Sequence, residues 1–395
     1  MKLSEIAMST AKVDVDRLKS IFKSRYGTVP LVVKSPGRIN VIGEHTDYNG
    51  GFVMPAAIDK AVYVAVSKRE DNEIHLYAED FKQSHEASLA ELNISEKGWP
   101  NYILGVVDQI IKRNKAIGGF NLYIDGDVPP GAGLSSSAAV ECATAFALDQ
   151  VFNLGFPKME LTDIAQKAEH VFAGVSCGIM DQFASVFGKK DHAIMLDCRS
   201  MEYEYVPLNL SGYQFLLLNT KVKHSLADSA YNDRRAQCEQ AVAWIKEAHP
   251  EVSTLRDVDM EMLEIYVKHR DVDVYEKCSY VVKENVRLIQ AAGYLKDGNL
   301  KALGKLMFDT HDGLSKSYEV SCDELDYLVD AVRAEKSVLG ARMMGGGFGG
   351  CTLNIVETEH ISELVKKLSE DYDQKFGLKL EAYLVETAAG TGIVL

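Results

Sequence analysis

The stretch GDVPPGAGLSSS, residues 126–137, joins a predicted strand at 120–124 to a predicted helix at 138–152. Its glycines let the backbone approach a ligand closely, and the helix start offers unpaired N–H groups at a positive dipole end. This pattern predicts an anion site formed by Gly131, Ala132, Gly133, Leu134, Ser135, Ser136 and Ser137. A serine-capped turn is the alternative, since serine is a favoured helix cap, but one cap does not require three serines.

Two common nucleotide-binding patterns do not fit the chain. A P-loop requires a lysine after its last glycine, and a dinucleotide fingerprint requires glycine where Ser136 stands; neither residue is present. The segment MGGGFGG at 344–350 does satisfy the GxGxxG spacing, but CTLNIV at 351–356 then follows with the composition of a strand, not a helix. The anion site therefore belongs to another class of phosphate loop, and a nucleotide-dependent dehydrogenase has no support beyond this spacing.

A second polar segment, PGRINVIGEHTDYNGG at 36–51, is predicted to form a loop between two strands. It contains Arg38, Glu44, His45 and Asp47. Each carboxylate can accept two hydroxyl hydrogen bonds, and a sugar presents its hydroxyls in a fixed fan. A solvated turn could hold the same residues, but four convergent polar types flanked by glycines favour recognition of a polyol.

Two further acidic residues have more than one interpretation. Asp181, in CGIMDQ at 177–182, is by default a helix cap or a surface acid, and a half-buried acid there could serve as a base. Glu169 stands at the edge of the apolar stripe of a predicted helix at 161–174, so its side chain could be solvated or point inward. Spacing alone does not decide between these alternatives.

The chain has 395 residues, a formal net charge of −14 and a pI near 5.3. This charge argues against nucleic acid or an anionic membrane as a main partner, because both need a cationic surface. No apolar run approaches the roughly 18 residues of a membrane span, and the amino terminus lacks the apolar stretch of a secretory signal. The seven cysteines never form a CxxC pair, so neither a disulfide framework nor structural zinc is expected. We therefore expect a cytoplasmic protein.

Hydrophobic patterning divides the chain into two predicted parts. Short β-type runs alternate with helices in the first half, whereas the pattern beyond about residue 225 is mainly helical until strand-like runs at 351–356 and 381–386. Single domains cluster at roughly 100–150 residues, so two domains are expected. We predict an α+β protein with an amino-terminal mixed α/β domain at 1–205 and a carboxy-terminal α+β domain at 206–395.

Taken in order, these segments and the stretch at 344–350 resemble the GHMP family of small-molecule kinases, which act on galactose, homoserine, mevalonate and phosphomevalonate. The run GRINVIGEHTDYNGGFVMPAAID (37–59) is most similar to the members that phosphorylate galactose, and the similarity extends over essentially the whole chain. The resemblance implies a two-domain fold with an antiparallel sheet in the second domain and the active site between the domains. It also implies a kinase that uses ATP and Mg²⁺ to phosphorylate the anomeric hydroxyl of galactose. We expect the protein to be a monomer.

The same resemblance implies roles for individual residues. Asp181 is implied as the base toward the anomeric hydroxyl, and Arg38 as the cation between that base and the transferring phosphoryl group. The implied sugar contacts are Glu44, His45, Thr46, Asp47, Gly178 and Tyr231. The implied phosphate loop is Gly131–Ser137, and the implied Mg²⁺ ligands are Ser137 and Glu169.

One departure from the family pattern and two rival functions stay open at this point. Met344 stands where the family commonly has threonine, so a hydroxyl near the phosphates or the sugar is absent. One rival is the same chemistry on N-acetylgalactosamine or arabinose, and EHTDYN at 44–49 resembles the galactose-phosphorylating members more. The other is a sensor that binds galactose and ATP without turnover; such sensors can lack two residues of the SSSAA stretch, which is intact at 135–139.

Overall fold

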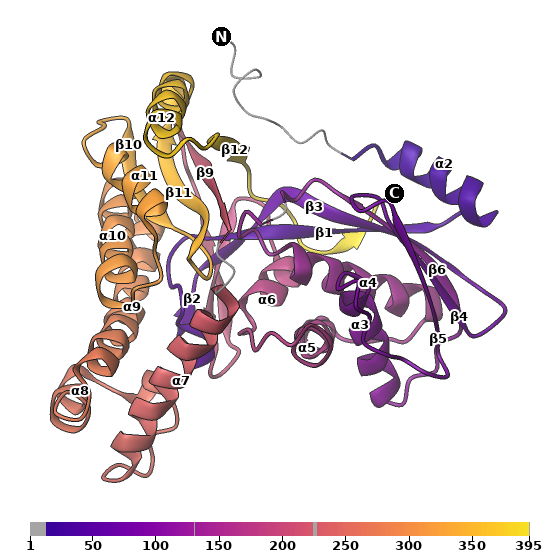
Figure 1. Ribbon diagram of the computed structural model, residues 1–395, viewed down its shortest axis with the longest axis horizontal. Helices are drawn as coiled ribbons and strands as arrows, with labels where there is room; N and C mark the ends of the chain where they lie inside the picture. The colour runs from indigo at the N-terminus through magenta and orange to yellow at the C-terminus, as the bar shows by residue number, and fades with distance from the viewer. Residues whose placement is uncertain (1–12, 130, 224–226, 395) are drawn as a thin grey trace.

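The computed structural model describes residues 13–129, 131–223 and 227–394, and its first part is built on a six-stranded sheet (Figure 1). Neighbouring strands are antiparallel except β4 and β6, which are parallel, so this sheet is mixed. The spatial order is β13 (Gly392–Ile393), β1 (Leu31–Asn40), β3 (Pro55–Lys68), β6 (Phe120–Gly126), β4 (Glu73–Ala78) and β5 (Gln83–Ser88). Strands β1 and β3 are buried nearly throughout, because helices cover both faces of the sheet.

Helices of the first half are divided between the two faces of this sheet (Figure 1). One face carries α3 (Pro100–Lys112), α4 (Ser136–Phe152), α5 (Lys158–Ala168) and α6 (Met180–Phe187). On the other face lies α2 (Val15–Tyr26), whose Leu18 and Phe22 pack on Val32 and Ala65. Asp14 caps α2 by accepting hydrogen bonds from the backbone amides of the next turn.

The second part contains a four-stranded antiparallel sheet. Its order is β10 (Val338–Met343), β11 (Gly349–Glu357), β9 (Tyr213–Lys223) and β12 (Glu381–Val385). Helices α11 (Asp323–Arg333) and α12 (Ile361–Phe376) pack against Leu216 and Leu218 on one face. Alternate side chains such as Leu217 and Leu353 join the same hydrophobic cluster as β1 and β3, so the two sheets share a core.

The remaining elements connect these two layers. A small antiparallel sheet consists of β2 (Phe52–Val53), β7 (His192–Asp197) and β8 (Tyr203–Pro207). Helices α7 (Ala227–Lys246), α8 (Met260–Tyr266), α9 (Val272–Lys296) and α10 (Leu300–Asp312) complete the second part. Within the described ranges, none of these or the other helices combines the length and apolarity needed to cross a membrane.

These elements confirm the predicted α+β class with a mixed sheet followed by an antiparallel one. The division at residue 205 stays a prediction; β13 pairs with β1, so the chain returns to the first sheet near its end. One local prediction was wrong: Arg38 lies inside β1, not in a loop. The register shifts between Pro36 and Arg38, and such a bulge accommodates a proline that cannot donate to the ladder.

Candidate active site

A cavity of about 380 Å³ lies where β1, the segment 43–48, the start of α6, helix α7 and the β10–β11 turn meet. Its walls contain charged, polar and apolar side chains and several glycines, and these residues come from both halves of the chain. The predicted site residues that line it are Arg38, Glu44, His45, Asp47, Glu169, Gly178, Asp181 and Tyr231. The fold therefore brings together segments up to about 300 residues apart in sequence, since Arg38 and Gly345 both line this cavity.

Arg38 and Asp181 form a two-point ion pair on the cavity wall. Arg38 Nε donates to Asp181 Oδ1 at 2.8 Å and Nη2 donates to Oδ2 at 3.1 Å. The third nitrogen, Nη1, donates to the Gly133 carbonyl at 2.5 Å, which ties the pair to the glycine-rich loop. Burial opposes the charge on Arg38, but Asp181 and Glu44 outweigh that effect and raise the guanidinium pKa. The carboxylate is thus held in a fixed orientation beside a permanent cation.

The glycine-rich loop docks directly on β1. Gly131 and Gly133 both have φ near +71°, a conformation that favours glycine. The Arg38 amide donates to the Leu134 carbonyl at 3.1 Å, and a Cβ on Gly37 would stand 2.7 Å from that same oxygen. Glycine is therefore required at position 37 for the loop to approach the strand this closely.

Ser135 does not act as the simple helix cap considered above. Its backbone is left-handed, with φ of 59°, and its side chain makes no cap hydrogen bond to the start of α4 within the described ranges. Instead, its hydroxyl donates to Asp181 Oδ2 at 2.5 Å. The amides of the first turn of α4 are consequently left for another acceptor, which is the arrangement of an anion site.

Glu169 points inward, as one of the two interpretations of its helix predicted. Helix α5 ends at Ala168, and Glu169 begins a π-helical turn that ends at Ala173, a geometry often found at functional sites. The carboxylate accepts from Gln182 Nε2 at 2.7 Å and also from Ser137. Burial raises the pKa of Glu169, and the nearby Asp181 adds to the rise. A hydroxyl and a carboxylate thus lie side by side at the start of α4.

A second, smaller cavity of about 160 Å³ adjoins the same helix start. Ser136 and Ser137 line it, together with Phe81 and Trp99, whose rings stack with centroids 6.5 Å apart. An apolar pocket with stacked aromatic rings suits a flat heterocycle. Sequence reasoning missed this cavity, because its aromatic residues come from separate segments without a motif.

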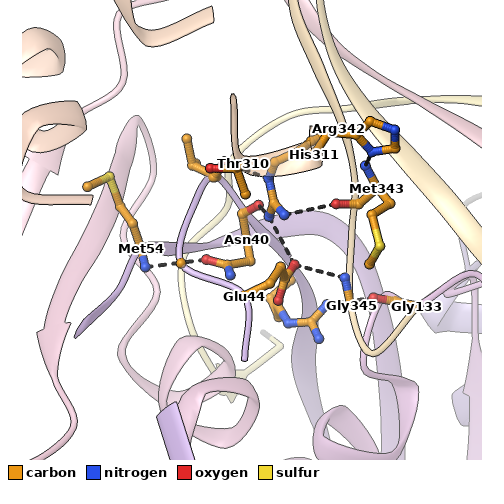
Figure 2. A network of polar contacts seen from close by, with 12 residues as sticks. Asn40, Glu44, Met54, Gly133, Thr310, His311, Arg342, Met343 and Gly345 are labelled. Carbon is orange, nitrogen blue, oxygen red and sulfur yellow. Dashed lines mark hydrogen bonds and ion pairs between the residues drawn. The ribbon is translucent and has the colours of Figure 1, made fainter. Parts of the chain in front are cut away.

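Glu44 is held by an arginine that sequence reasoning also missed. Figure 2 shows Arg342, which is fully buried, at the centre of a polar network between β1 and β10. Its Nη2 lies 2.9 Å from Glu44 Oε1, and the Gly345 amide donates to the same oxygen at 2.8 Å. Burial opposes ionisation of Glu44, but Arg342 and then Arg38 outweigh it and lower the pKa of the carboxyl.

Asp47 and His45 are two further ionisable residues of the cavity, and burial shifts the pKa of both toward the neutral form. Burial, and after it the charge of Asp181, raises the pKa of Asp47 to about 7. Burial lowers the pKa of His45 to about 4, so its imidazole is neutral at pH 7. The Nε2 atom of His45 is buried and has no side-chain hydrogen-bond partner among the described residues, while the Gly346 backbone is within hydrogen-bonding reach of the ring. Tyr231 packs on that imidazole with ring centroids 5.4 Å apart.

The predicted phosphate loop at 131–137 lies outside the lining of the first cavity, and so do Thr46 and Met344. The Thr46 side chain is buried, and its hydroxyl is directed at the carbonyls of Gly43 and Phe52, at 3.0 and 2.6 Å. Met344 is also buried, in the hydrophobic cluster shared by the two sheets, while its amide donates to the Cys351 carbonyl at 3.0 Å. Thr46 therefore holds the turn that carries Glu44 and His45, and Met344 contributes apolar packing.

Three segments of the chain match known protein families. Residues 20–68 match the galactokinase galactose-binding signature, residues 101–189 the amino-terminal domain of GHMP kinases, and residues 291–374 the carboxy-terminal domain of GHMP kinases. The galactokinase of Thermotoga maritima is 42% identical over 361 residues, covering 91% of this chain and 99% of that protein. That of Fusobacterium nucleatum is 42% identical over 366 residues, covering 91% and 94%.

Solved structures of GHMP kinases are also similar to this chain. The crystal structure of Lactococcus lactis galactokinase complexed with galactose superposes with a TM-score of 0.92 at 34% identity, covering 96% of this chain and 100% of that one. The mevalonate kinase of Methanococcus jannaschii superposes with a TM-score of 0.65 at 19% identity, covering 92% and 99%. The second comparison concerns the fold alone, whereas the first extends to sequence over nearly the whole chain.

Proposed function

The chain belongs to the galactokinase family of GHMP kinases, and on that premise we propose that it transfers the γ-phosphoryl group of ATP to the anomeric hydroxyl of galactose. The products are galactose 1-phosphate and ADP. The observation that carries this proposal is the single cavity in which the Arg38–Asp181 pair faces Glu44 and Asp47. A cation paired with a carboxylate suits the reacting end of the sugar, and further carboxylates suit its other hydroxyls.

In the proposed reaction, the anomeric oxygen forms a bond to the γ-phosphorus as the bond to the β-phosphate bridging oxygen breaks. Asp181 accepts the hydroxyl proton late, and Arg38 stabilises charge on the transferring group. Because the transition state is loose, positioning and charge stabilisation supply most of the rate gain. The hydrogen bonds from Arg38 and Ser135 support this role, because they orient Asp181 toward the glycine-rich loop.

The start of α4 is the proposed binding site for the ATP phosphates, with amides of Gly131–Ser137 as donors. The cavity beside Phe81 and Trp99 would take the adenine ring, since Ser136 and Ser137 line it as well. Ser137 and Glu169 offer adjoining hard oxygen donors, which suit Mg²⁺ bound partly by protein and partly by substrate phosphates. When bound, that ion would neutralise charge on the phosphate oxygens.

The decisive experiment is a coupled kinase assay of the purified protein over a panel of galactose, glucose, N-acetylgalactosamine and arabinose. We expect galactose to be the best substrate. Glucose differs at the 4-hydroxyl, and a misplaced hydroxyl leaves a buried carboxylate unpaired at a cost of about 1–3 kcal/mol. Its kcat/KM is therefore expected to be roughly 10–100-fold lower. Equal use of glucose would contradict the pocket assignment, and sugar binding without turnover would favour a sensor. A monomeric state and a cytoplasmic location remain predictions.

Gly178 provides a second test, because it lies against a predicted sugar contact. A Cβ at this position would stand 1.8 Å from Asp47 Oδ2, so Gly178→Ala must displace that carboxylate. We expect the galactose KM to rise roughly 10–100-fold, the usual penalty for a misfit of about 1–3 kcal/mol. Gly293→Ala is the matched control, since its Cβ meets no atom within 4 Å. A KM equal to that of the control would argue against a sugar contact by Asp47.

The pH dependence of galactose binding should report on Asp47. Its pKa of about 7 means that the carboxylate acceptor is lost as pH falls below 7, so kcat/KM should fall by up to about tenfold per pH unit there. The free energy of unfolding should change with pH in the opposite direction. A raised pKa of Asp47 in the folded state stabilises the folded protein at low pH, and this contribution is lost as pH rises through about 7. Asp47→Asn should abolish the kinetic inflection. A flat wild-type profile between roughly pH 6 and pH 8 would contradict this assignment.

A further inference from the structure

We propose that Tyr48, supported by Tyr318, is a positioning residue that fixes the tautomer of His45, so that Nε2–H points into the sugar cavity as a hydrogen-bond donor. The proposal rests on the proposed function for the identity of the ligand. It assigns a role to two tyrosines that do not line the cavity themselves. It also predicts the donor and acceptor pattern that the sugar meets.

A continuous chain of hydrogen bonds runs from the imidazole into the core. Nδ1 of His45 lies 2.7 Å from Tyr48 Oη, and that oxygen lies 2.7 Å from Tyr318 Oη. Tyr318 Oη in turn lies 3.4 Å from the Cys238 sulfur, and both of these side chains are fully buried. Each hydroxyl in this chain has a single proton, so the direction of one bond constrains the direction of the next.

Acid–base matching selects one direction for this chain. A phenol is a far better hydrogen-bond donor than a neutral imidazole N–H, and an imidazole nitrogen is a far better acceptor than a phenol oxygen. The strong arrangement therefore has Tyr48 donating to Nδ1 of His45. Tyr318 then donates to Tyr48, and the thiol of Cys238 supplies the weak final donor. Since a neutral imidazole carries one proton, that proton must reside on Nε2.

The surroundings of His45 hold this ring in place. Its backbone has φ of 62°, which is uncommon for a residue with a side chain, and its carbonyl accepts from Asn49 at 2.9 Å. Tyr318 and Tyr231 pack on the ring with centroids 4.9 and 5.4 Å away. The buried Nε2 has no side-chain partner among the described residues, and the Gly346 backbone is within hydrogen-bonding reach of the ring. His45 and Gly346 both line the cavity, so Nε2 is the ring nitrogen that a ligand there would meet.

This assignment complements the other polar groups of the cavity. Glu44 and Asp47 can only accept hydrogen bonds when ionised, so each uses the proton of a sugar hydroxyl. A hydroxyl that donates to a carboxylate still has lone pairs, and Nε2–H of His45 can donate to them. A histidine with the reverse tautomer would compete with the carboxylates for the same proton. Tyr48 therefore makes His45 complementary to its acidic neighbours.

The tautomer can be read directly from long-range ¹H–¹⁵N correlations of the histidine rings in the unliganded protein. The His45 signal is identified by its absence in His45→Gln. We expect wild type to show Nε2–H. Tyr48→Phe removes the donor to Nδ1 and should give a mixture of tautomers. Tyr318→Phe should retain Nε2–H, because Tyr48 can still donate to His45. A wild-type protein with Nδ1–H would overturn the proposal.

Kinetics give an independent readout. One neutral hydrogen bond contributes about 0.5–1.5 kcal/mol, so Tyr48→Phe should raise the galactose KM roughly threefold to tenfold with kcat within about twofold of wild type. Tyr266→Phe is the matched control. The Tyr266 hydroxyl also forms a hydrogen bond with a histidine, His249 Nε2, at 3.1 Å, but neither residue lines the cavity. An unchanged KM in Tyr48→Phe would also overturn the proposal. Failure of the proposed function would appear separately, as absence of galactose turnover in wild type while the unliganded tautomer is unaffected.

Discussion

Asp181→Asn is expected to lower kcat for galactose by about 10²–10⁴-fold, the usual contribution of a positioned acid or base. The asparagine is nearly isosteric but cannot accept the anomeric proton. It also places an amide where a carboxylate oxygen now receives Arg38 Nη2 and the Ser135 hydroxyl. Arg38 Nε, Arg38 Nη2 and the Ser135 hydroxyl, three donors that now share two oxygens, would then have one oxygen left, so the orientation of Arg38 would suffer together with the proton transfer. Binding of galactose through the proposed contacts Glu44 and Asp47 should persist, so KM should change less than kcat.

The measurement is steady-state kinetics with ATP at saturation, combined with thermal unfolding of each variant. Arg38 has only 5% of its side chain exposed, so loss of its partner should lower the melting temperature somewhat. Asp163→Asn is the matched control, because Asp163 is likewise paired with an arginine, Arg113, but away from the cavity. Turnover by a folded Asp181→Asn protein within a few-fold of wild type would remove the base assignment.

Much of this site was accessible from the sequence because its residues lie in compact motifs. The glycine and serine run at 131–137 has a local physical meaning, and the segment at 36–51 collects four polar side chains within a short stretch. Gly178 and Asp181 likewise lie within one hexapeptide. Such motifs carry their chemistry without knowledge of the tertiary structure. The structure places Arg38, Glu44, His45, Asp47, Gly178 and Asp181 around one cavity, and it places Ser136 and Ser137 at a second cavity.

Other parts could not be predicted because their meaning depends on contacts between distant segments. The position of Ser135 before a helix is typical of a helix cap, yet its hydroxyl contacts Asp181, which lies 46 positions away in the sequence. Tyr318 has no local motif, and its hydroxyl reaches Tyr48 across 270 positions. The loop predicted around Arg38 is a bulged strand, since β3 supplies pairing partners that local composition does not reveal. Patterning predicts which elements exist more readily than which side chains they bring together.

Arg342 is the strongest example of a residue that only the tertiary structure explains. It follows a glycine and an alanine in an apolar strand, where a buried cation would be unexpected. Its guanidinium donates to the carbonyls of Asn40, Val41 and Met343 and pairs with Glu44 (Figure 2). It thus joins the end of β1 to the end of β10 and orients a carboxylate of the cavity.

Arg342→Met is therefore expected to lower the free energy of unfolding by about 3–5 kcal/mol, the usual cost of removing one member of a buried ion pair. Methionine fills part of the volume but leaves Glu44, whose side chain is 3% exposed, without its main counter-charge. Denaturant titration at pH 7 measures the loss. Arg235→Met is the matched control, since its pair with Glu239 is partly exposed and should contribute at most about 1 kcal/mol.

A double variant separates the lost charge pairing from lost packing. In Glu44→Gln/Arg342→Met the uncompensated charge is absent, so its unfolding free energy should exceed the value expected if both single effects were additive.

The pH dependence of the unfolding free energy of Arg342→Met has a definite sign as well. Arg342 holds the pKa of Glu44 low in wild type, which stabilises the folded state above the unfolded pKa and is lost as pH falls. In Arg342→Met burial raises the pKa of Glu44 instead. The difference in unfolding free energy between this variant and wild type should therefore shrink as pH is lowered. A difference that is constant with pH, together with additive single effects, would show that Arg342 acts by packing alone.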